Sequence, residues 1–361
     1  MPTIQERIKE IEDELKRTEY NKATEKHIGL LKAKLSKLET EMLSHRKGGG
    51  EGFAIPKSGD ATVALVGYPN VGKSSILNAL TDQTSETGNF AFTTLRVVPG
   101  ILNYRGAQIQ ILDLPGIIEN ASSGAGRGRE VLSIVRNADL VLLVTDVEAK
   151  GLDRIVNELH RAGIVLNRRR KNISLKKGNS GGIKIHKPKK VDIDDEQIRM
   201  VLKEFKITNA DLFIRENVTV DDIIDYLRGS TVYASCLVAV NKTDLPYDET
   251  SLEPLRMFGP VVKVSAATGK GIEELKEQIF QSLSLIRVFL KDKSGYVDLE
   301  RPMVLRSGAT VRDVVRKISR EMLQSFRYAI LTGPGRKIGE QRVGLDFYLM
   351  DGDTITIISR N

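Results

Sequence analysis

The sequence predicts an α/β fold built on a mostly parallel sheet with helices on both faces. Apolar runs alternate with helical patterns between residues 60 and 150: "ATVALVG", "QIQILDLPG" and "ADLVLLVTD" indicate buried strands, and "SSILNAL" opens a helix. The pattern returns at "CLVAVNKTD" and "PVVKVSA", followed by a helix from about Gly271 to Leu285. Such alternation is typical of parallel strands connected by helices. A chain of 361 residues is also long enough for several domains.

The N-terminal segment, residues 1–48, predicts a helical hairpin. Thr3 and Glu6 form a capping box at the expected start of the first helix. We expect the hairpin to pack on itself or on its neighbour, with docking to another macromolecule as the alternative. The stretch "SHRKGGGEG" then predicts a flexible, glycine-rich join. Apolar residues recur at helical spacing along both halves, at Ile4, Ile8, Ile11 and Leu15 and then at Ile28, Leu31, Leu35, Leu38 and Met42.

The rest of the chain divides by pattern into three parts. The parallel sheet is expected from residues 60–150 and 231–285, which together form one domain. Residues 151–230 interrupt it and predict an inserted α+β subdomain. The tail, residues 286–361, shows short strands around one helix and predicts a small α+β module.

The inserted subdomain contains the most basic part of the chain. Residues 165–191 hold ten Lys or Arg and no Asp or Glu, and "NSGG" within them predicts a strand hairpin. Two helical stretches follow, the second opened by a capping box of Thr219 and Asp222. Clustered cations can neutralise phosphates, which gives salt-sensitive and sequence-independent affinity for nucleic acid. The interval lacks Phe, Tyr and Trp, so base stacking is not expected from it, and a solvated basic surface without a ligand is the alternative.

Composition excludes several classes of protein. No run of about 18 apolar residues occurs, so a membrane span is not expected. The N-terminus, "MPTIQERIKEIEDEL", is acidic and amphipathic, unlike a secretory signal. A single cysteine, Cys236, excludes an internal disulfide and a multi-cysteine zinc site, and its apolar run "ASCLVAV" predicts burial. Together these features favour a cytoplasmic protein. The net charge of +8 would suit a polyanionic partner, and the alternative is that it serves only solubility.

A phosphate-binding loop lies between the first strand and the first helix of the sheet domain. The sequence from Gly67 to Ser74, "GYPNVGKS", matches Gly-x4-Gly-Lys-Ser. Glycines let backbone N–H groups turn inward around a phosphate, Lys73 can neutralise the β- and γ-phosphates, and the Ser74 hydroxyl can bind Mg²⁺. The loop therefore predicts a nucleoside triphosphate site.

Two further motifs indicate guanine rather than adenine. Asp244, in "NKTD" at the end of a strand, can accept hydrogen bonds from the N1–H and exocyclic amine of guanine, a pair that adenine cannot supply. Asn241 and Lys242 would brace the base and the phosphate loop. Ser265, Ala266 and Ala267, in "SAATGKG", fit a backbone contact to the guanine O6.

The remaining magnesium and γ-phosphate elements are expected at "DLPG" and "FAFTTL". Asp113 would hold Mg²⁺ through a water, and the Gly116 N–H would contact the γ-phosphate. Thr94 would complete the magnesium shell with Ser74 and Asp113, and Thr93 is the alternative. The residues expected at the nucleotide are Asn70, Val71, Gly72, Lys73, Ser74, Ser75, Asp113, Leu114, Pro115, Gly116, Ile117, Asn241, Lys242, Asp244, Ser265, Ala266 and Ala267.

These motifs carry a family resemblance that covers essentially the whole chain. The stretches "YPNVGKSS", "FAFTTL" and "DLPGIIENAS" resemble the Obg-related GTPases. The hairpin "NKATEKHIGLLKAKLSKLE", the insertion before "NKTD" and the tail "QRVGLDFYLMDGDTITI" are similar to the developmentally regulated GTP-binding protein (Drg) family. The resemblance implies a P-loop GTPase domain and a C-terminal TGS module with a ubiquitin-like β-grasp fold. It also implies association with ribosomes or RNA and, in eukaryotes, with a small stabilising partner protein.

Hydrolysis is expected to depart from the Ras pattern. Ile117 follows Gly116, where Ras-like enzymes place a glutamine that orients water, and isoleucine has no donor or acceptor for that task. Asn70 resembles the phosphate-loop asparagine that holds a monovalent cation in potassium-activated relatives, and the alternative is that it only shapes the turn. Lys73, Thr94, Gly116 and Asn70 are therefore the residues expected to act in slow, K⁺-stimulated hydrolysis.

The segment "ENASSGAGRGRE", residues 119–130, is expected to reorder with the γ-phosphate as a switch loop. Arg127 and Arg129 within it are expected to be solvated or to contact a partner, and a role as cis arginine fingers is the alternative.

The predicted function is a GTP-binding and GTP-hydrolysing switch that acts with ribosomes or RNA, through residues 165–191 and the TGS module. DNA sequence specificity is not expected. The alternative is a nucleotide-bound scaffold with little hydrolysis, and a metabolic kinase is disfavoured because it would have no use for "NKTD".

Overall fold

The computed structural model describes residues 3–44, 58–81, 97–114, 127–292, 294–334 and 339–360. The chain divides into two compact units. The first unit comprises Met1–Phe53 and Asp153–Ala234, and the second comprises Ala54–Leu152 and Ser235–Asn361.

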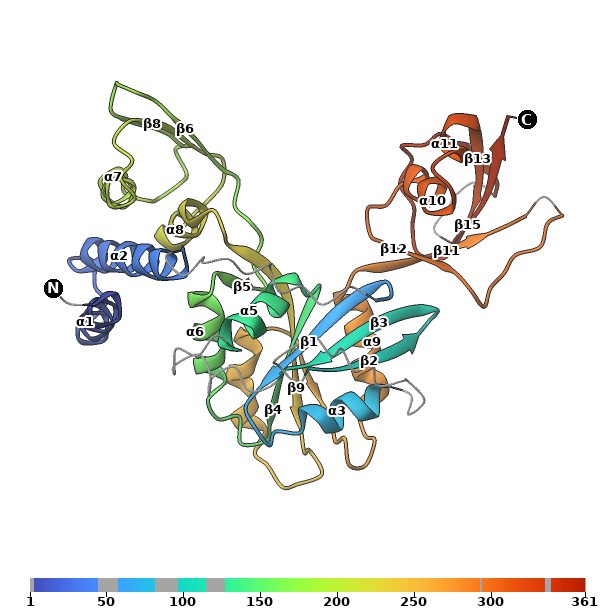
Figure 1. The fold of residues 1–361 in the computed structure, drawn as a ribbon, viewed down its shortest axis with the longest axis horizontal. Coiled ribbons are helices and arrows are strands. Elements are labelled where there is room, and N and C mark those ends of the chain that lie inside the picture. The colour runs from blue at the N-terminus through green and yellow to red at the C-terminus, as the bar shows by residue number, and fades with distance from the viewer. Residues whose placement is uncertain are drawn as a thin grey trace. The chain divides into compact units, whose positions relative to one another are not determined.

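The second unit contains the predicted parallel sheet, in the strand order β10–β9–β4–β1–β3–β2 (Figure 1). The apolar runs chosen from sequence form its central strands, and β1 has the bounds of "ATVALVG". β2 was not predicted; it pairs antiparallel with β3 through a turn in which Arg105 and Gly106 both have positive φ, as a two-residue hairpin loop requires. The strands are β1 (Ala61–Gly67), β2 (Val98–Tyr104), β3 (Ala107–Asp113), β4 (Leu140–Asp146), β9 (Val232–Asn241) and β10 (Val261–Lys263).

Helices cover the sheet because alternate strand residues are apolar on both faces. α3 (Lys73–Leu80) and α9 (Ile272–Ser282) bury apolar side chains in one cluster with odd-numbered residues of β1 and β3, such as Val63 and Ile109. The intervening residues of β1 are equally buried on the other face. α5 (Arg127–Asn137) and the 3₁₀ helix η1 (Glu249–Met257) complete this part.

The C-terminal part of the second unit is a five-stranded sheet in the order β12–β11–β15–β13–β14. β11 pairs parallel with β15, and two short helices, α10 and α11, contribute to a separate core around Val314 and Ile355. The elements are β11 (Leu285–Leu290), β12 (Met303–Arg306), α10 (Val311–Ile318), α11 (Met322–Ser325), β13 (Phe326–Thr332), β14 (Gln341–Val343) and β15 (Asp353–Ser359).

The first unit joins the N-terminal hairpin to the insertion. Both predicted helices are present, and Thr3 accepts a hydrogen bond from the Glu6 N–H while its own N–H donates to the Glu6 carboxylate at 2.7 Å, which confirms the capping box. α2 packs beside α7 and α8, and Lys32 forms an ion pair with Asp221 at 2.9 Å, so the hairpin packs on its neighbour as expected. The helices are α1 (Ile4–Arg17), α2 (Glu25–Ser44), α6 (Leu152–Arg161), α7 (Asp195–Glu204) and α8 (Val220–Arg228).

The strand hairpin predicted at "NSGG" is wrong. β6 (Ile173–Lys177) and β7 (Ile183–His186), which flank that turn, do not pair with each other. Both pair with β8 (Ala210–Ile214), antiparallel to β6 and parallel to β7. β8, which comes later in the sequence, pairs with β6 at one edge and with β7 at the other. The turn therefore connects two strands that lie on opposite sides of β8. A short strand, β5 (Ile164–Leu166), pairs with the start of β9.

Among the described residues, no helix combines the length and the apolar character needed to cross a membrane. Cys236 is buried in β9, as predicted, and burial raises the pKa of its thiol to about 12.

Candidate nucleotide-binding site

The phosphate loop connects β1 to α3 through a sharply turned backbone. Asn70 and Gly72 have φ values of 65° and 90°. A Cβ on Gly72 would lie 2.2 Å from the Asn241 Nδ2, and a Cβ on Gly67 would lie 2.2 Å from the Val144 carbonyl oxygen. Glycine is therefore required at both positions. The loop ends at the N-terminus of α3, where free backbone N–H groups favour an anion.

Lys73 and Ser74 begin α3 and point to different parts of the loop. The Lys73 ammonium donates to the carbonyl oxygens of Gly67 at 3.0 Å and Tyr68 at 2.8 Å, so it lies across the loop. The Ser74 hydroxyl donates to the Asp113 carboxylate at 2.5 Å. Since β1 and β3 are parallel neighbours, their carboxyl ends bring this hydroxyl and this carboxylate together.

Asp113 is largely buried, and its burial raises the pKa of the carboxyl against the opposing effects of the Ser74 hydrogen bond and the Lys73 charge. Nearby positive charge would favour the ionised form. Among the described residues, no group of three or more His, Cys, Asp or Glu side chains could hold a metal. One hydroxyl and one carboxylate nevertheless fit Mg²⁺, which uses few protein ligands and takes its other oxygens from phosphates and water.

Asn241 links the phosphate loop to the loop that follows β10. Its Nδ2 donates to the Val71 carbonyl oxygen at 3.0 Å, and its Oδ1 accepts from the Ala266 N–H at 3.0 Å. The side chain is buried, so both bonds are shielded from water. A single amide therefore fixes the distance between the phosphate end and the base end of the site.

Asp244 and Ser265 face each other at the base end. The Ser265 hydroxyl donates to the Asp244 carboxylate at 2.6 Å, and this bond lowers the pKa of Asp244. An ionised carboxylate only accepts hydrogen bonds, which is the property needed to bind two N–H donors of a base. The Lys242 ammonium forms an ion pair with Asp146 at 3.1 Å. Asp146 was not predicted, although its place at the end of β4, in "LVTD", matches that of the other site carboxylates.

The structure brings together the predicted residues on the described parts of these loops. Val71 and Leu114 are buried, whereas Ser75 and Ala267 are exposed beside them. Thr93, Thr94, Pro115, Gly116 and Ile117 lie outside the described residues, as do most of residues 119–130 and the side chains of Arg127 and Arg129.

Three family models match the chain in succession. Residues 62–176 match a model described as a 50S ribosome-binding GTPase, and residues 180–285 match the C-terminal region of that domain. Residues 286–359 match the TGS domain. The β-grasp arrangement of the C-terminal sheet agrees with the last match.

Curated relatives match over almost the full length. An uncharacterized GTP-binding protein of Methanocaldococcus jannaschii is 47% identical, covering 98% of this chain and 93% of the relative. Developmentally-regulated G-protein 3 of Arabidopsis thaliana is 42% identical over 100% of both chains, and developmentally-regulated GTP-binding protein 1 of Xenopus laevis is 41% identical over 98% of both. The solved G domain of the T. maritima FeoB iron transporter covers 62% of this chain and 98% of its own at 22% identity, with a TM-score of 0.30. The full-length relatives and the matched domains show that this chain belongs to the developmentally regulated GTP-binding protein family of P-loop GTPases.

Proposed function

We propose that this protein is a GTP-hydrolysing molecular switch that binds Mg²⁺·GTP and acts with ribosomes or RNA in the cytoplasm. The observation that carries the proposal is the Asn241 amide, which bonds to both the phosphate loop at Val71 and the base loop at Ala266. Because this amide connects the two loops, a nucleotide whose phosphates bind the phosphate loop would have its base positioned at the base loop. The protein can then discriminate between bases as well as between phosphate states.

Guanine selection falls to Asp244. Its lowered pKa keeps the carboxylate ionised at neutral pH, ready to accept from the N1–H and the exocyclic amine of guanine. The Ser265 hydroxyl holds the carboxylate from the side. Adenine has no donor at N1 and would leave a charged acceptor without partners, which is how polar sites reject a close analogue.

Ser74 and Asp113 would hold Mg²⁺, with Thr94 as a third oxygen ligand. A Mg²⁺ ion bound there would neutralise charge on the β- and γ-phosphates. Lys73 would turn its ammonium from the loop carbonyls towards those phosphates, since a phosphate is the stronger acceptor.

Hydrolysis would be slow without a partner because Ile117 cannot orient the attacking water. Asn70 occupies a positive-φ position of the phosphate loop, a conformation that asparagine tolerates, and we assign to it the binding of K⁺ beside the bond between the β- and γ-phosphates. Positive charge at that bond would stabilise the transition state.

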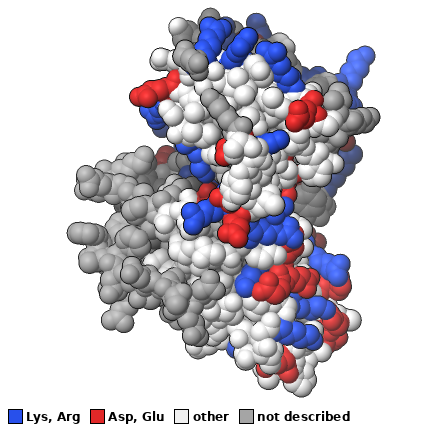
Figure 2. All heavy atoms as spheres, turned by 90° about the vertical axis from the view of Figure 1, so that its right-hand side faces the viewer, with Lys and Arg blue, Asp and Glu red and all other residues white. Residues whose placement is uncertain are grey.

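The ribosome or RNA role rests on the family models and on the distribution of charge. The matched model describes ribosome-binding GTPases, and a TGS domain follows it. On the face drawn in Figure 2, basic side chains line much of the upper margin, and basic and acidic side chains are interspersed below it, so the face as a whole is not one basic surface. Residues 165–191, in the first unit, carry ten cations without an acid and are the better candidate. A small stabilising partner protein would be a further contact.

The test is release of phosphate from GTP by the purified chain, with and without ribosomes, in KCl and NaCl of equal ionic strength. We expect the chain to hydrolyse GTP, and ATP not to inhibit this hydrolysis. The rate of phosphate release should be higher in KCl than in NaCl, and higher again when ribosomes are present. Asn70→Ala should abolish the difference between the salts, and Asn103→Ala, on the exposed edge strand β2, should preserve it. Equal rates in both salts would remove the K⁺ assignment.

Absence of phosphate release under every condition, with GTP still bound, would favour the alternative function, a nucleotide-bound scaffold. Competition by ATP as effective as by GTP would overturn guanine selection and with it the switch.

A further inference from the structure

The three-stranded sheet of the first unit has one covered face and one open face. Residues Ile173, Ile183, Leu212 and Ile214 point to the covered face, where they join a core with side chains of α7 and α8. Side chains alternate along a strand, so the residues between them point to the other side. The open face carries Ser174 and Lys176 of β6, Lys184 and His186 of β7, and Asp211 and Phe213 of β8, with Arg215 directly after it.

An aromatic pair lies on this open face. The register places His186 opposite Phe213, and their rings stack with centroids 4.5 Å apart and planes inclined by 10°. The Arg215 guanidinium lies 5.9 Å from the Phe213 ring centroid. The His186 ring therefore covers one face of the Phe213 ring, and the three planar groups form a row with Phe213 in the middle, on a surface that the core does not use.

Neighbouring polar groups hold the outer members of this row. Arg215 donates to Asn172 Oδ1 at 3.2 Å and to the Ser174 hydroxyl at 3.1 Å, so its plane is fixed without a carboxylate. The His186 Nε2 lies 3.2 Å from the Asp211 carboxylate, which fixes the imidazole. Groups held in this way lose little side-chain freedom when a ligand stacks on them.

The charge of the open face is mainly positive. Lys176, Lys184 and Arg215 are exposed, and Asp211, the one acid that the face carries among the described residues, is already bonded to His186. Lys176 and Lys184 form no ion pair within the described ranges. A single-stranded nucleic acid matches both properties, because it carries a planar base and a negative charge at every nucleotide.

We propose that the open face, at His186, Phe213 and Arg215, binds single-stranded RNA by stacking an unpaired base. This inference rests on the proposed RNA role and specifies its form. Sequence alone did not suggest it because residues 165–191 contain no Phe, Tyr or Trp. Phe213 lies on β8, which follows residues 165–191 in the sequence. The pairing of β8 with β6 and β7 places its ring near the lysines of those two strands. Bases of single strands stack on aromatic and guanidinium planes in this manner, whereas duplex RNA keeps its bases inside.

The experiment measures binding of the full chain to three fluorescent probes: an oligouridylate of about 12 nucleotides, an abasic strand of equal length and charge, and an RNA duplex of equal length. We expect Phe213→Leu, which removes the middle plane that positions His186 and Arg215 for stacking, to weaken oligouridylate binding about tenfold and to leave the other two probes unchanged. Lys184→Ala, the matched control on the same face, should weaken all three probes to a similar degree, because it removes charge and not a stacking plane.

Phe213→Trp separates the role of the ring from damage to the sheet, because it keeps a stacking plane and should retain or tighten oligouridylate binding. Phe213→Leu binding to oligouridylate as tightly as the wild type would overturn the stacking inference, and the loss caused by Lys184→Ala would then leave the RNA role standing. Failure of the wild type to bind any probe would overturn the stacking inference and the proposed RNA partner together.

Discussion

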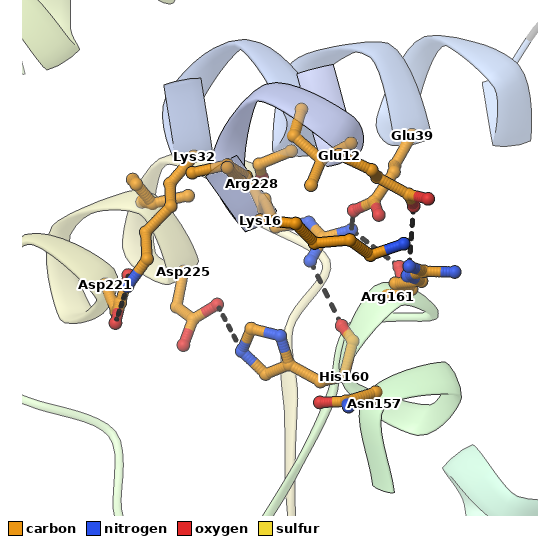
Figure 3. A pocket seen from close by; sticks show the side chains of 14 residues that line it. Glu12, Lys16, Lys32, Glu39, Asn157, His160, Arg161, Asp221, Asp225 and Arg228 are labelled. Carbon is orange, nitrogen blue, oxygen red and sulfur yellow. Dashed lines mark hydrogen bonds and ion pairs between the residues drawn. The ribbon is translucent and has the colours of Figure 1, made fainter. Parts of the chain in front are cut away.

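Two regions of this molecule concentrate charged side chains, and they use them differently. In the nucleotide site Asp113 and Asp244 lie at or just after strand ends and Lys73 begins α3, and each of the three is hydrogen-bonded to an uncharged group. In the first unit a pocket of about 480 Å³ between α1, α2, α6 and α8 is also lined by acids and bases, but these are bonded to one another (Figure 3).

The pocket is organised around Arg228, whose side chain is almost fully buried. Its guanidinium donates to the Glu39 carboxylate at 3.1 Å and to the carbonyl oxygens of His160 at 3.2 Å and Arg161 at 2.7 Å. In Figure 3 the Arg161 side chain points to Glu12, and an ion pair of 2.6 Å joins them. These bonds tie α2, α6 and α8 together.

The two carboxylates Asp244 and Glu39 show what the difference means. A hydrogen bond from Ser265 lowers the pKa of Asp244, which is exposed and remains an anion. Burial raises the pKa of Glu39 to about 7, since desolvation outweighs the attraction of Arg228. A carboxylate that is held as an anion at the surface suits a ligand, and a buried carboxyl of raised pKa suits a structural role.

Breaking the pocket should give the largest effect. Arg228→Ala removes three hydrogen bonds at once and leaves Glu39 buried without its partner, so we expect the free energy of unfolding to fall by about 3–5 kcal/mol. Urea unfolding followed by circular dichroism measures it. The matched control is Arg169→Ala, which removes an exposed pair with Glu216 and should cost less than about 1 kcal/mol. Similar losses for the two variants would contradict a structural role for the pocket.

Breaking the nucleotide site should change binding and not stability. Asp244→Asn replaces an acceptor with a group that also donates, so GDP affinity should fall about 100-fold, or about 2.7 kcal/mol, with an unchanged unfolding midpoint. Asp248→Asn is the matched control, because Asp248 also accepts from a hydroxyl and has a lowered pKa, yet lies in the helix cap that follows. Titration with a fluorescent GDP distinguishes them, and an equal loss in both variants would sink the assignment of the base to Asp244.

The same comparison explains what sequence could predict. The nucleotide motifs were recognisable because each is contiguous and follows a strand whose neighbours in a parallel sheet can be expected. The order of strands then brings Ser74 to Asp113 and Asn241 to Val71 without further information. Contacts confined to one turn were equally readable, as the capping box of Thr219 and Asp222 shows.

Contacts that depend on pairing or packing were not readable. Glu39 and Arg228 lie far apart in sequence, and neither has a local pattern that marks it as buried and paired. "NSGG" has the composition of a hairpin turn, but both flanking strands pair with β8 and not with each other. The same pairing places the Phe213 ring of β8 on the open face between β6 and β7. Local composition fixes the turn, whereas the whole sheet fixes the partner.

The pH dependence of stability tests the same comparison between the pocket and the nucleotide site, and we expect it to give the smallest effect of the three. Glu39 has an ordinary pKa of 4.5 in the unfolded chain and a pKa of about 7 in the folded one. Between these values the folded chain holds a proton that the unfolded chain has lost, so stability should fall as pH rises from about 4.5 to 7. We expect this contribution to be about 1–2 kcal/mol, below the full linkage value, because water that reaches the pocket compensates part of the desolvation.

Glu39→Gln isolates that contribution, since the amide keeps the shape and does not titrate. His160 and Asp225, which face the same pocket, also titrate with shifted pKa values, lowered and raised respectively by burial, so the difference between variant and wild type is the quantity to follow. Urea unfolding at intervals from pH 4.5 to 8 should show wild type and variant diverging in favour of the variant as pH rises. Parallel curves would mean that Glu39 is already ionised at low pH, and the pocket would then hold a charged pair as the nucleotide site does.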